Sequence, residues 1–132
     1  MSKKMIGTGL LIAAAFMLIM VSCSKTTTVV LDSGTAVTTT VQFTKDIVPI
    51  LSKNCALTGC HNGSVKPNLT ATLAYSSLTT GGYVDTGKPE NSEVYLWLTG
   101  KKSATMPLGA PNNPSNINQL MLAWIKQGAK NN

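Results

Sequence analysis

The 132-residue sequence contains no arginine, a single histidine and only seven aromatic residues. Its formal charge of +6 comes from eleven lysines set against five acidic residues. Without arginine there is no planar guanidinium to form paired hydrogen bonds with phosphates or base edges. The lysines are scattered and no aromatic residues interleave with them. We therefore expect a mildly basic surface and no nucleic-acid partner.

The sequence also lacks any internal repeat and any alternation of apolar and polar residues long enough to build a sheet. Apolar residues recur instead at helical spacing, as in Ile47, Ile50 and Leu51. This pattern predicts one all-α domain of three to five short helices joined by long loops. The expected helices run from near Asp46 (capped by it or by Thr44) to Asn54, from Asn68 or Thr70 to Gly81, from Pro89 or Ser92 to Gly100, and from Ser115 or Asn116 to Gly128, the last carrying the apolar stripe Ile117, Leu120, Met121, Trp124 and Ile125.

Residues 1–22 are typical of a secretion signal. A start with two lysines precedes the apolar run Leu10–Val21, which is too short to span a bilayer. The run ends in Met20-Val21-Ser22-Cys23, which resembles a bacterial lipobox and implies cleavage before Cys23 with a diacylglycerol on its sulfur. Ordinary signal cleavage near Ser22 is the alternative. Residues 23–40 are rich in threonine and serine, so we expect a tether between a membrane and a folded domain at 41–132.

Two thiols and the only imidazole fall within seven positions, Cys55–His61. A pair of thiols followed at once by a histidine is the arrangement that attaches haem c, because the thiols add to the two vinyl groups and the histidine binds the iron. The sequence therefore predicts one covalent haem c, with Cys55, Cys60 and His61 as its binding residues. A haem would also fill the core of a small domain with such long loops.

Four residues, rather than the usual two, separate the cysteines. The distance between the vinyl groups is fixed, so the two extra residues must bulge outward. Gly59 and the small Ala56 and Thr58 make that bulge feasible.

The second axial ligand cannot be a histidine of the same chain, since His61 is the only one. Beyond the leader the methionines are Met106 and Met121. Met121 belongs to the apolar stripe of the last helix and is expected to pack in the core. Met106 precedes Pro107 in a loop that can present its thioether freely, so it is the candidate metal ligand opposite His61.

Residues 43–132 resemble a class I monohaem cytochrome c of the small bacterial kind found as lipoproteins. The resemblance implies thioether bonds from Cys55 and Cys60, His61 and Met106 as axial ligands, and first and last helices that pack near Trp124. It is carried by the order and spacing of Phe43-Thr44-Lys45-Asp46-Ile47-Val48-Pro49-Ile50-Leu51, Cys60-His61, Ser92-x-x-Tyr95-Leu96, Met106-Pro107 and Trp124-Ile125-x-x-Gly128-Ala129.

Other interpretations of the site remain open. A Cys55–Cys60 disulfide would suit an exported, haem-free lipoprotein that acts as an interaction module. A haem sensor or peroxidase-like site would need an open sixth position in place of Met106. A zinc site is disfavoured because Cys60 and His61 are adjacent and no fourth ligand is in view. A Cys-His or Ser-His-Asp hydrolase is disfavoured because no nucleophile-elbow motif is present.

These observations together predict an electron-transfer protein rather than an enzyme, with iron cycling between ferric and ferrous states. We expect it outside the cytoplasm, in the periplasm or at the cell surface, anchored to a membrane through its N-terminal lipid. Its partners would be redox proteins, and it would act as a monomer or as a module of a larger assembly.

Overall fold

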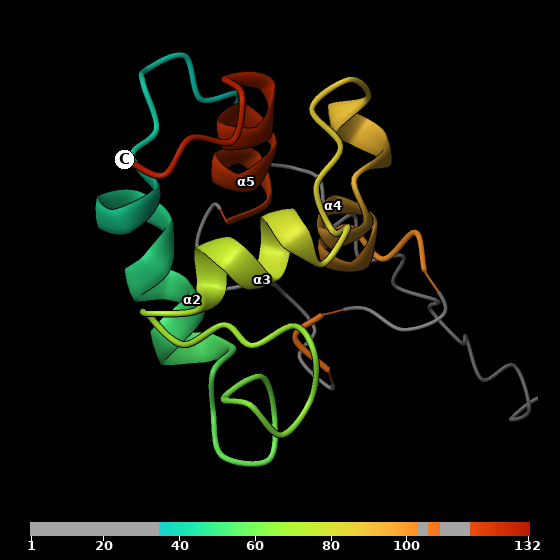
Figure 1. Cartoon of the computed structure of the whole chain (residues 1–132). Helices are drawn as coiled ribbons and strands as arrows, with labels where there is room; N and C mark the ends of the chain where they lie inside the picture. The colour runs from blue at the N-terminus through green and yellow to red at the C-terminus, as the bar shows by residue number, and fades with distance from the viewer. Residues whose placement is uncertain (1–34, 103–105, 109–116) are drawn as a thin grey trace, which may run out of the picture.

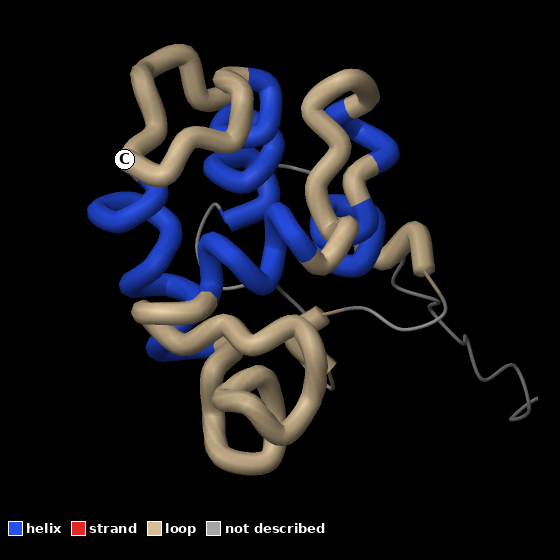
Figure 2. Tube along the Cα trace, viewed as in Figure 1, coloured by secondary structure: helices blue, strands red, loops and turns tan. Residues whose placement is uncertain are grey.

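The computed structural model describes residues 35–102, 106–108 and 117–132. Every regular element within those residues is a helix and none is a strand, as Figure 2 shows. The all-α prediction is therefore confirmed, and the four α-helices of the described part agree with the expected three to five. In chain order the elements are η1 (Phe43–Ile47), α2 (Val48–Asn54), α3 (Ala74–Thr80), η2 (Pro89–Asn91), α4 (Glu93–Leu98) and α5 (Ile117–Lys126), as Figure 1 shows.

The first helix begins at Phe43, so the predicted start near Asp46 is wrong. Asp46 lies inside the five-residue π-helix η1, and its carboxylate accepts the backbone N–H of Gln42 at 2.8 Å. Thr44 is not a cap either, because its hydroxyl donates to the carbonyl of Asn132 at 2.7 Å. The start of this helix is thus fixed partly by the far end of the chain, which a local pattern cannot show.

Of the middle helices, α3 starts later than predicted. The predicted opening at Pro89 or Ser92 is confirmed, because η2 begins at Pro89 and Ser92 is the residue directly before α4. Asn68 accepts the N–H of Thr70 at 3.0 Å in a local turn, and α3 begins only at Ala74. Ser92 precedes α4 but makes no cap bond. It is buried, and its hydroxyl accepts the N–H of Asp85 at 2.9 Å, which closes the preceding loop instead.

The first and last helices pack against each other through aromatic side chains, as the resemblance implies. The rings of Phe43 and Trp124 lie 4.7 Å apart between centroids, and Tyr75 of α3 meets Phe43 edge-on at 5.6 Å. Phe43 and Trp124 are almost completely buried. Removing such side chains from water is the main stabilising contribution available to a small domain.

The predicted apolar stripe of α5 faces the core. Met121 is completely buried, so its assignment to core packing is confirmed. Leu120 packs at the edge of this core and is partly buried. Gly128 follows the helix with φ +92°, the left-handed conformation that ends helices at glycine. The predicted caps Ser115 and Asn116 lie outside the described residues. The other buried members of the stripe are Ile117, Trp124 and Ile125.

The C-terminus is fastened beside the start of the domain (Figure 1). Gln127 accepts the N–H of Val41 at 2.9 Å and donates to the carbonyl of Thr39 at 3.0 Å. Asn132 accepts the N–H of Phe43 at 2.9 Å. Val41 is buried in the core, and Val37 before it packs against the core. None of the described helices has the length and apolar character needed to cross a membrane.

Candidate functional site: the Cys55–His61 loop and Met106

The loop that carries Cys55, Cys60 and His61 starts directly at the end of α2. The N–H of Cys55 donates to the carbonyl of Leu51 at 2.9 Å, so the last helical turn holds the first cysteine. The N–H of His61 donates to the carbonyl of Cys55 at 3.1 Å. This bond closes the loop on itself and brings the three predicted residues together on one short segment.

The residues between the two cysteines turn toward solvent. Leu57 is 49% exposed, and Thr58 and Gly59 are exposed as well. Gly59 has φ +79°, a left-handed conformation that costs other residues about 1–2 kcal/mol. No atom lies within 4 Å of the place where a Cβ at Gly59 would stand. The longer linker therefore projects outward without crowding the rest of the site.

The imidazole of His61 is held by one hydrogen bond that also fixes its tautomer. Nδ1 lies 3.0 Å from the carbonyl oxygen of Pro67. A carbonyl can only accept, so Nδ1 carries the hydrogen and Nε2 keeps its lone pair. Histidines that bind metals through Nε2 are oriented in this way by a partner on the other nitrogen. The ring is half-buried, and Leu69 donates to the His61 carbonyl at 2.7 Å to hold the return of the loop.

The two cysteines are free thiols in different environments. Cys55 is half-buried against the hydrophobic core, whereas Cys60 is exposed. The pKa of the Cys55 thiol is raised to about 11. Burial is the larger cause and the nearby Cys60 is the smaller one. Both effects disfavour the charged thiolate. At neutral pH Cys55 is therefore a protonated, weakly reactive thiol, and Cys60 is the accessible one.

Met106 is attached to the end of α4. Its backbone N–H donates to the carbonyl of Trp97 at 3.1 Å, and its side chain is partly buried against the core. Leu108, which follows Pro107, is 75% exposed. The backbone of Met106 is thus held by the end of α4, while Leu108 faces solvent.

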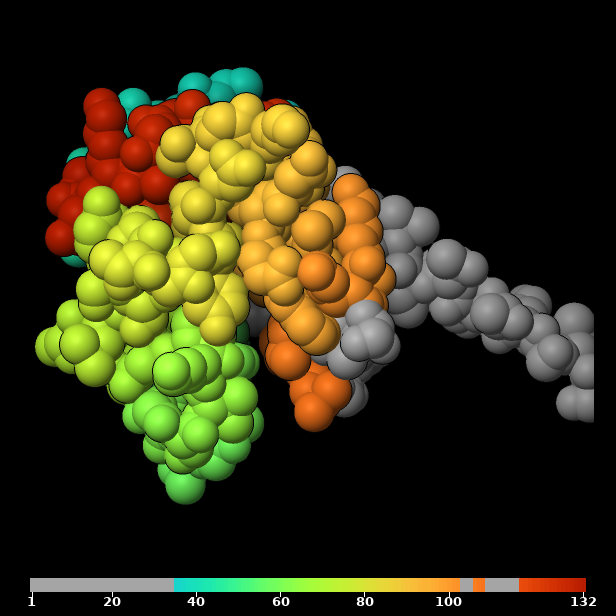
Figure 3. All heavy atoms as spheres, turned by 45° about the vertical axis from the view of Figure 1, so that its right-hand side comes forward, coloured from blue at the N-terminus to red at the C-terminus, as the bar shows by residue number. Residues whose placement is uncertain are grey.

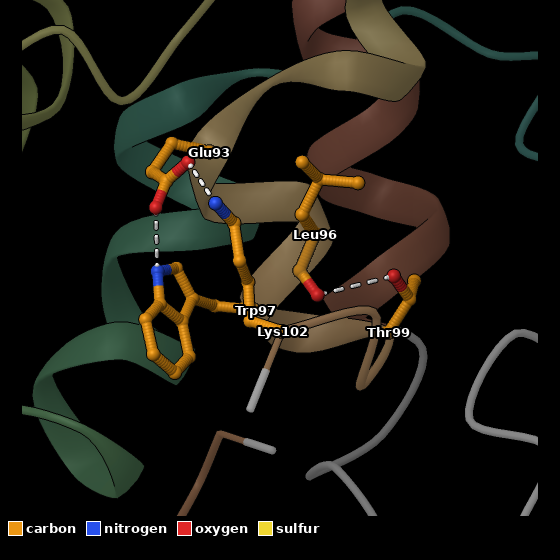
Figure 4. Close-up of polar contacts among 5 residues, drawn as sticks. All are labelled: Glu93, Leu96, Trp97, Thr99 and Lys102. Atoms are coloured by element: carbon orange, nitrogen blue, oxygen red, sulfur yellow. Dashed lines mark hydrogen bonds and ion pairs between the residues drawn. The ribbon is translucent and has the colours of Figure 1, made fainter. Parts of the chain in front are cut away.

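The end of α4 is itself braced by a polar cluster, shown in Figure 4. Glu93 accepts the indole N–H of Trp97 at 2.9 Å and pairs with the ammonium of Lys102 at 2.9 Å. The hydrogen bond from Lys102 lowers the pKa of the Glu93 carboxyl, burial opposes this, and the Trp97 N–H assists it. Thr99 donates its hydroxyl to the carbonyl of Tyr95 at 2.8 Å.

Figure 3 shows a hollow between the green lobe around residues 55–70 and the orange segment 106–108. The lobe carries Cys55, Cys60 and His61, and the segment carries Met106. The predicted residues therefore belong to the two segments that border this hollow. The sequence did not indicate the carbonyls of Pro67 and Trp97, because backbone acceptors have no side-chain signature.

Other features do not belong to this hollow. A pocket beside the chain ends is lined by Thr40, Val41, Trp124, Gln127, Lys130 and Asn132, none of which is a predicted site residue. In the described ranges no three histidine, cysteine, aspartate or glutamate side chains form a group that could hold a metal ion. Cys23, the predicted lipidation site, lies outside the described residues.

No protein-family model, no curated protein and no solved structure matches the chain.

Proposed function

We propose that the chain is an extracytoplasmic electron-transfer protein that carries one covalent haem c in the hollow between the Cys55–His61 loop and Met106. The observation that carries this proposal is the hydrogen bond from His61 Nδ1 to Pro67, which leaves Nε2 available as a metal ligand beside two free thiols. A surface histidine next to an incidental cysteine pair has no need of a fixed tautomer.

The residues present fit such a group. Cys55 and Cys60 would hold the haem: each S–H would add across a vinyl group, so that the S–H bond and the C=C π bond would break, one C–S and one C–H bond would form, and no oxidant or reductant would be consumed. Cys60 is accessible for this addition, and Cys55 is held by α2 at a fixed position. When bound, the haem iron supplies the one-electron chemistry by alternating between its ferric and ferrous states.

Met106 is proposed as the second axial ligand. Its thioether is neutral and polarisable, so it favours the lower charge of the ferrous state and raises the reduction potential. Its backbone bond to Trp97 and its packing on the core limit how far it can withdraw. The role of the chain is to hold two different ligands and to exclude water, rather than to transform a substrate.

The localisation proposal rests on the leader and on Cys23. A lipid on Cys23 would tether the domain to a membrane through residues 23–40, with the haem site free to meet redox partner proteins. Two alternatives remain as outcomes of the tests below: a haem-free module with a Cys55–Cys60 disulfide, and a haem sensor with an open sixth position.

The test compares M106L with M121L in residues 24–132, exported by a host that matures haem c. Reduced-minus-oxidised visible spectra and a redox titration are recorded for both variants and for the parent. Met106→Leu should remove the far-red methionine-to-iron charge-transfer band, lower the potential and admit added imidazole. Met121→Leu conserves core volume and should change none of these.

Three results would redirect the proposal. A colourless parent without free thiols indicates the disulfide module. A coloured parent that binds imidazole as readily as M106L indicates an open-site sensor. A coloured parent whose potential is the same in M106L shows that Met106 is not the ligand.

A further inference from the structure

We propose that Glu93 is a positioning residue for Met106 and acts on it through Trp97 and Lys102. Only the predicted effect of Glu93 on imidazole binding at the iron rests on the proposed function. The positioning itself concerns the chain and can be measured with or without a cofactor.

The Glu93 carboxylate contacts two partners at once. Oε1 of Glu93 accepts the indole N–H of Trp97, and Oε2 pairs with Lys102, each at 2.9 Å. Trp97 lies one helical turn after Glu93 on α4, whereas Lys102 lies beyond the end of that helix. Figure 4 shows the three side chains converging on one side of the helix. Glu93 therefore ties the chain that leaves α4 back to the start of α4.

Trp97 connects this cluster to Met106. The Trp97 residue that binds Glu93 through its ring also accepts the N–H of Met106 through its carbonyl, at 3.1 Å. Its neighbour Leu96 accepts the N–H of Lys101 at 2.9 Å. The segment that leads to Met106 is thus fastened at Lys102 by a side chain and at Met106 by the backbone.

The chain is therefore held at Lys102 and again at Met106. Only three residues separate Lys102 from Met106 in the sequence. A residue close in sequence to a held one can reach fewer positions, so holding Lys102 favours the position in which the Met106 N–H bonds to the Trp97 carbonyl. A ligand held in place before binding loses less entropy when it binds.

A second acidic residue provides a matched control. Glu90 of η2 pairs with Lys126 at 2.7 Å, and both side chains are about half exposed. This ion pair joins η2 to the last turn of α5, and among the described residues neither member hydrogen-bonds to or pairs with residues 106–108. If Glu93 acted only as a surface charge, E93Q and E90Q would behave alike.

The experiment measures hydrogen exchange at the Met106 amide in the full chain as isolated from its exporting host. E93Q and K102M should exchange this amide about two- to fivefold faster than the parent, the range expected for loss of one partly exposed ion pair. E90Q should leave it unchanged. Amides of α5 should not respond to E93Q, which separates local positioning from general loss of stability.

Equal exchange at Met106 in E93Q, E90Q and the parent overturns the inference, whatever cofactor the protein holds. In haem-loaded protein, imidazole affinity should rise by the same factor in E93Q and not in E90Q. If exchange responds to E93Q while imidazole affinity is the same in all variants including M106L, then the positioning stands and the ligand role of Met106 fails.

Discussion

At the scale of residues, the two cysteines of one loop are chemically unequal. Cys55 is desolvated against the core, and Cys60 is exposed. The thiolate is the nucleophilic form of cysteine, and burial disfavours it. The difference arises from the last turn of α2, which holds Cys55 inward before the linker turns out to solvent.

This inequality predicts the order of alkylation in haem-free protein made in a host without haem c maturation. At pH 8 iodoacetamide should modify Cys60 first. A shift of two pKa units leaves Cys55 with on the order of 100-fold less thiolate than an ordinary thiol. Peptide mass spectrometry over time measures both rates, and urea-unfolded protein, in which the two should converge, is the control. Equal rates in the folded chain would show that Cys55 is not desolvated.

The same shift predicts a pH dependence of stability. The folded chain holds the Cys55 proton up to about pH 11, whereas the unfolded chain releases it near its ordinary value of 9.0. The unfolding free energy of haem-free protein should therefore fall as the pH rises from 9 to 11. Urea titrations across this range should show the fall in the parent and a smaller one in C55A. An identical profile in both would contradict the assignment.

Ser52 offers a separate test, because its hydroxyl is buried and has no hydrogen-bond partner within the described residues. Replacing it by alanine removes a desolvated polar group and favours the helix, so S52A should raise the unfolding free energy by about 1 kcal/mol. Ser76→Ala is the control, since the Ser76 hydroxyl is exposed and donates to Leu73 at 3.1 Å. If urea titrations give S52A no advantage over S76A, the Ser52 hydroxyl has a partner in solution.

At the scale of elements, apolar spacing located the helices but missed the starts of the first helix and of α3. Burial against the core decides which face of a helix is apolar, so Ile47 of η1 and Leu51 of α2 reveal this pair of helices from sequence alone. The start at Phe43 depends on Asn132, which is distant in the sequence. The site could likewise be predicted only in part. The chemistry of Cys55 and His61 lies in their side chains and is visible in the sequence, whereas the acceptor at Pro67 is a backbone oxygen and is not.

The linker between the cysteines depends on the left-handed conformation of Gly59. Since no atom would meet an added Cβ, Gly59→Ala should lower the unfolding free energy through backbone strain alone, by about 1 kcal/mol. Gly59→Asn should cost less, because asparagine tolerates this conformation. Thermal unfolding of the two variants beside the parent measures the difference. An alanine variant as stable as the parent would mean that the linker adopts another conformation.

At the scale of the whole molecule, the described part is a small helical domain whose two ends are packed together by Phe43 and Trp124. This contact lies away from the Cys55–His61 loop in sequence and stabilises the frame on which the loop is mounted. A hollow lies between the lobe around residues 55–70 and segment 106–108 (Figure 3).

Removal of the central aromatic contact should therefore unfold the domain. Phe43→Ala should cost about 3–5 kcal/mol, the range for a buried aromatic residue. Leu108→Ala, at a side chain that is 75% exposed, should change stability by less than about 0.5 kcal/mol. Urea unfolding followed by circular dichroism compares the two. A mild effect of F43A would show that the helix ends are held chiefly by other contacts.

The central claim, a haem bound covalently through Cys55 and Cys60, is tested most directly by the intact mass of exported protein after acid-acetone extraction. The account predicts the mass of the chain plus one haem, with a pyridine haemochrome band typical of two thioethers and none in C55A/C60A. A parent chain that keeps no haem, isolated from its native host so that its own attachment enzyme is present, would contradict it.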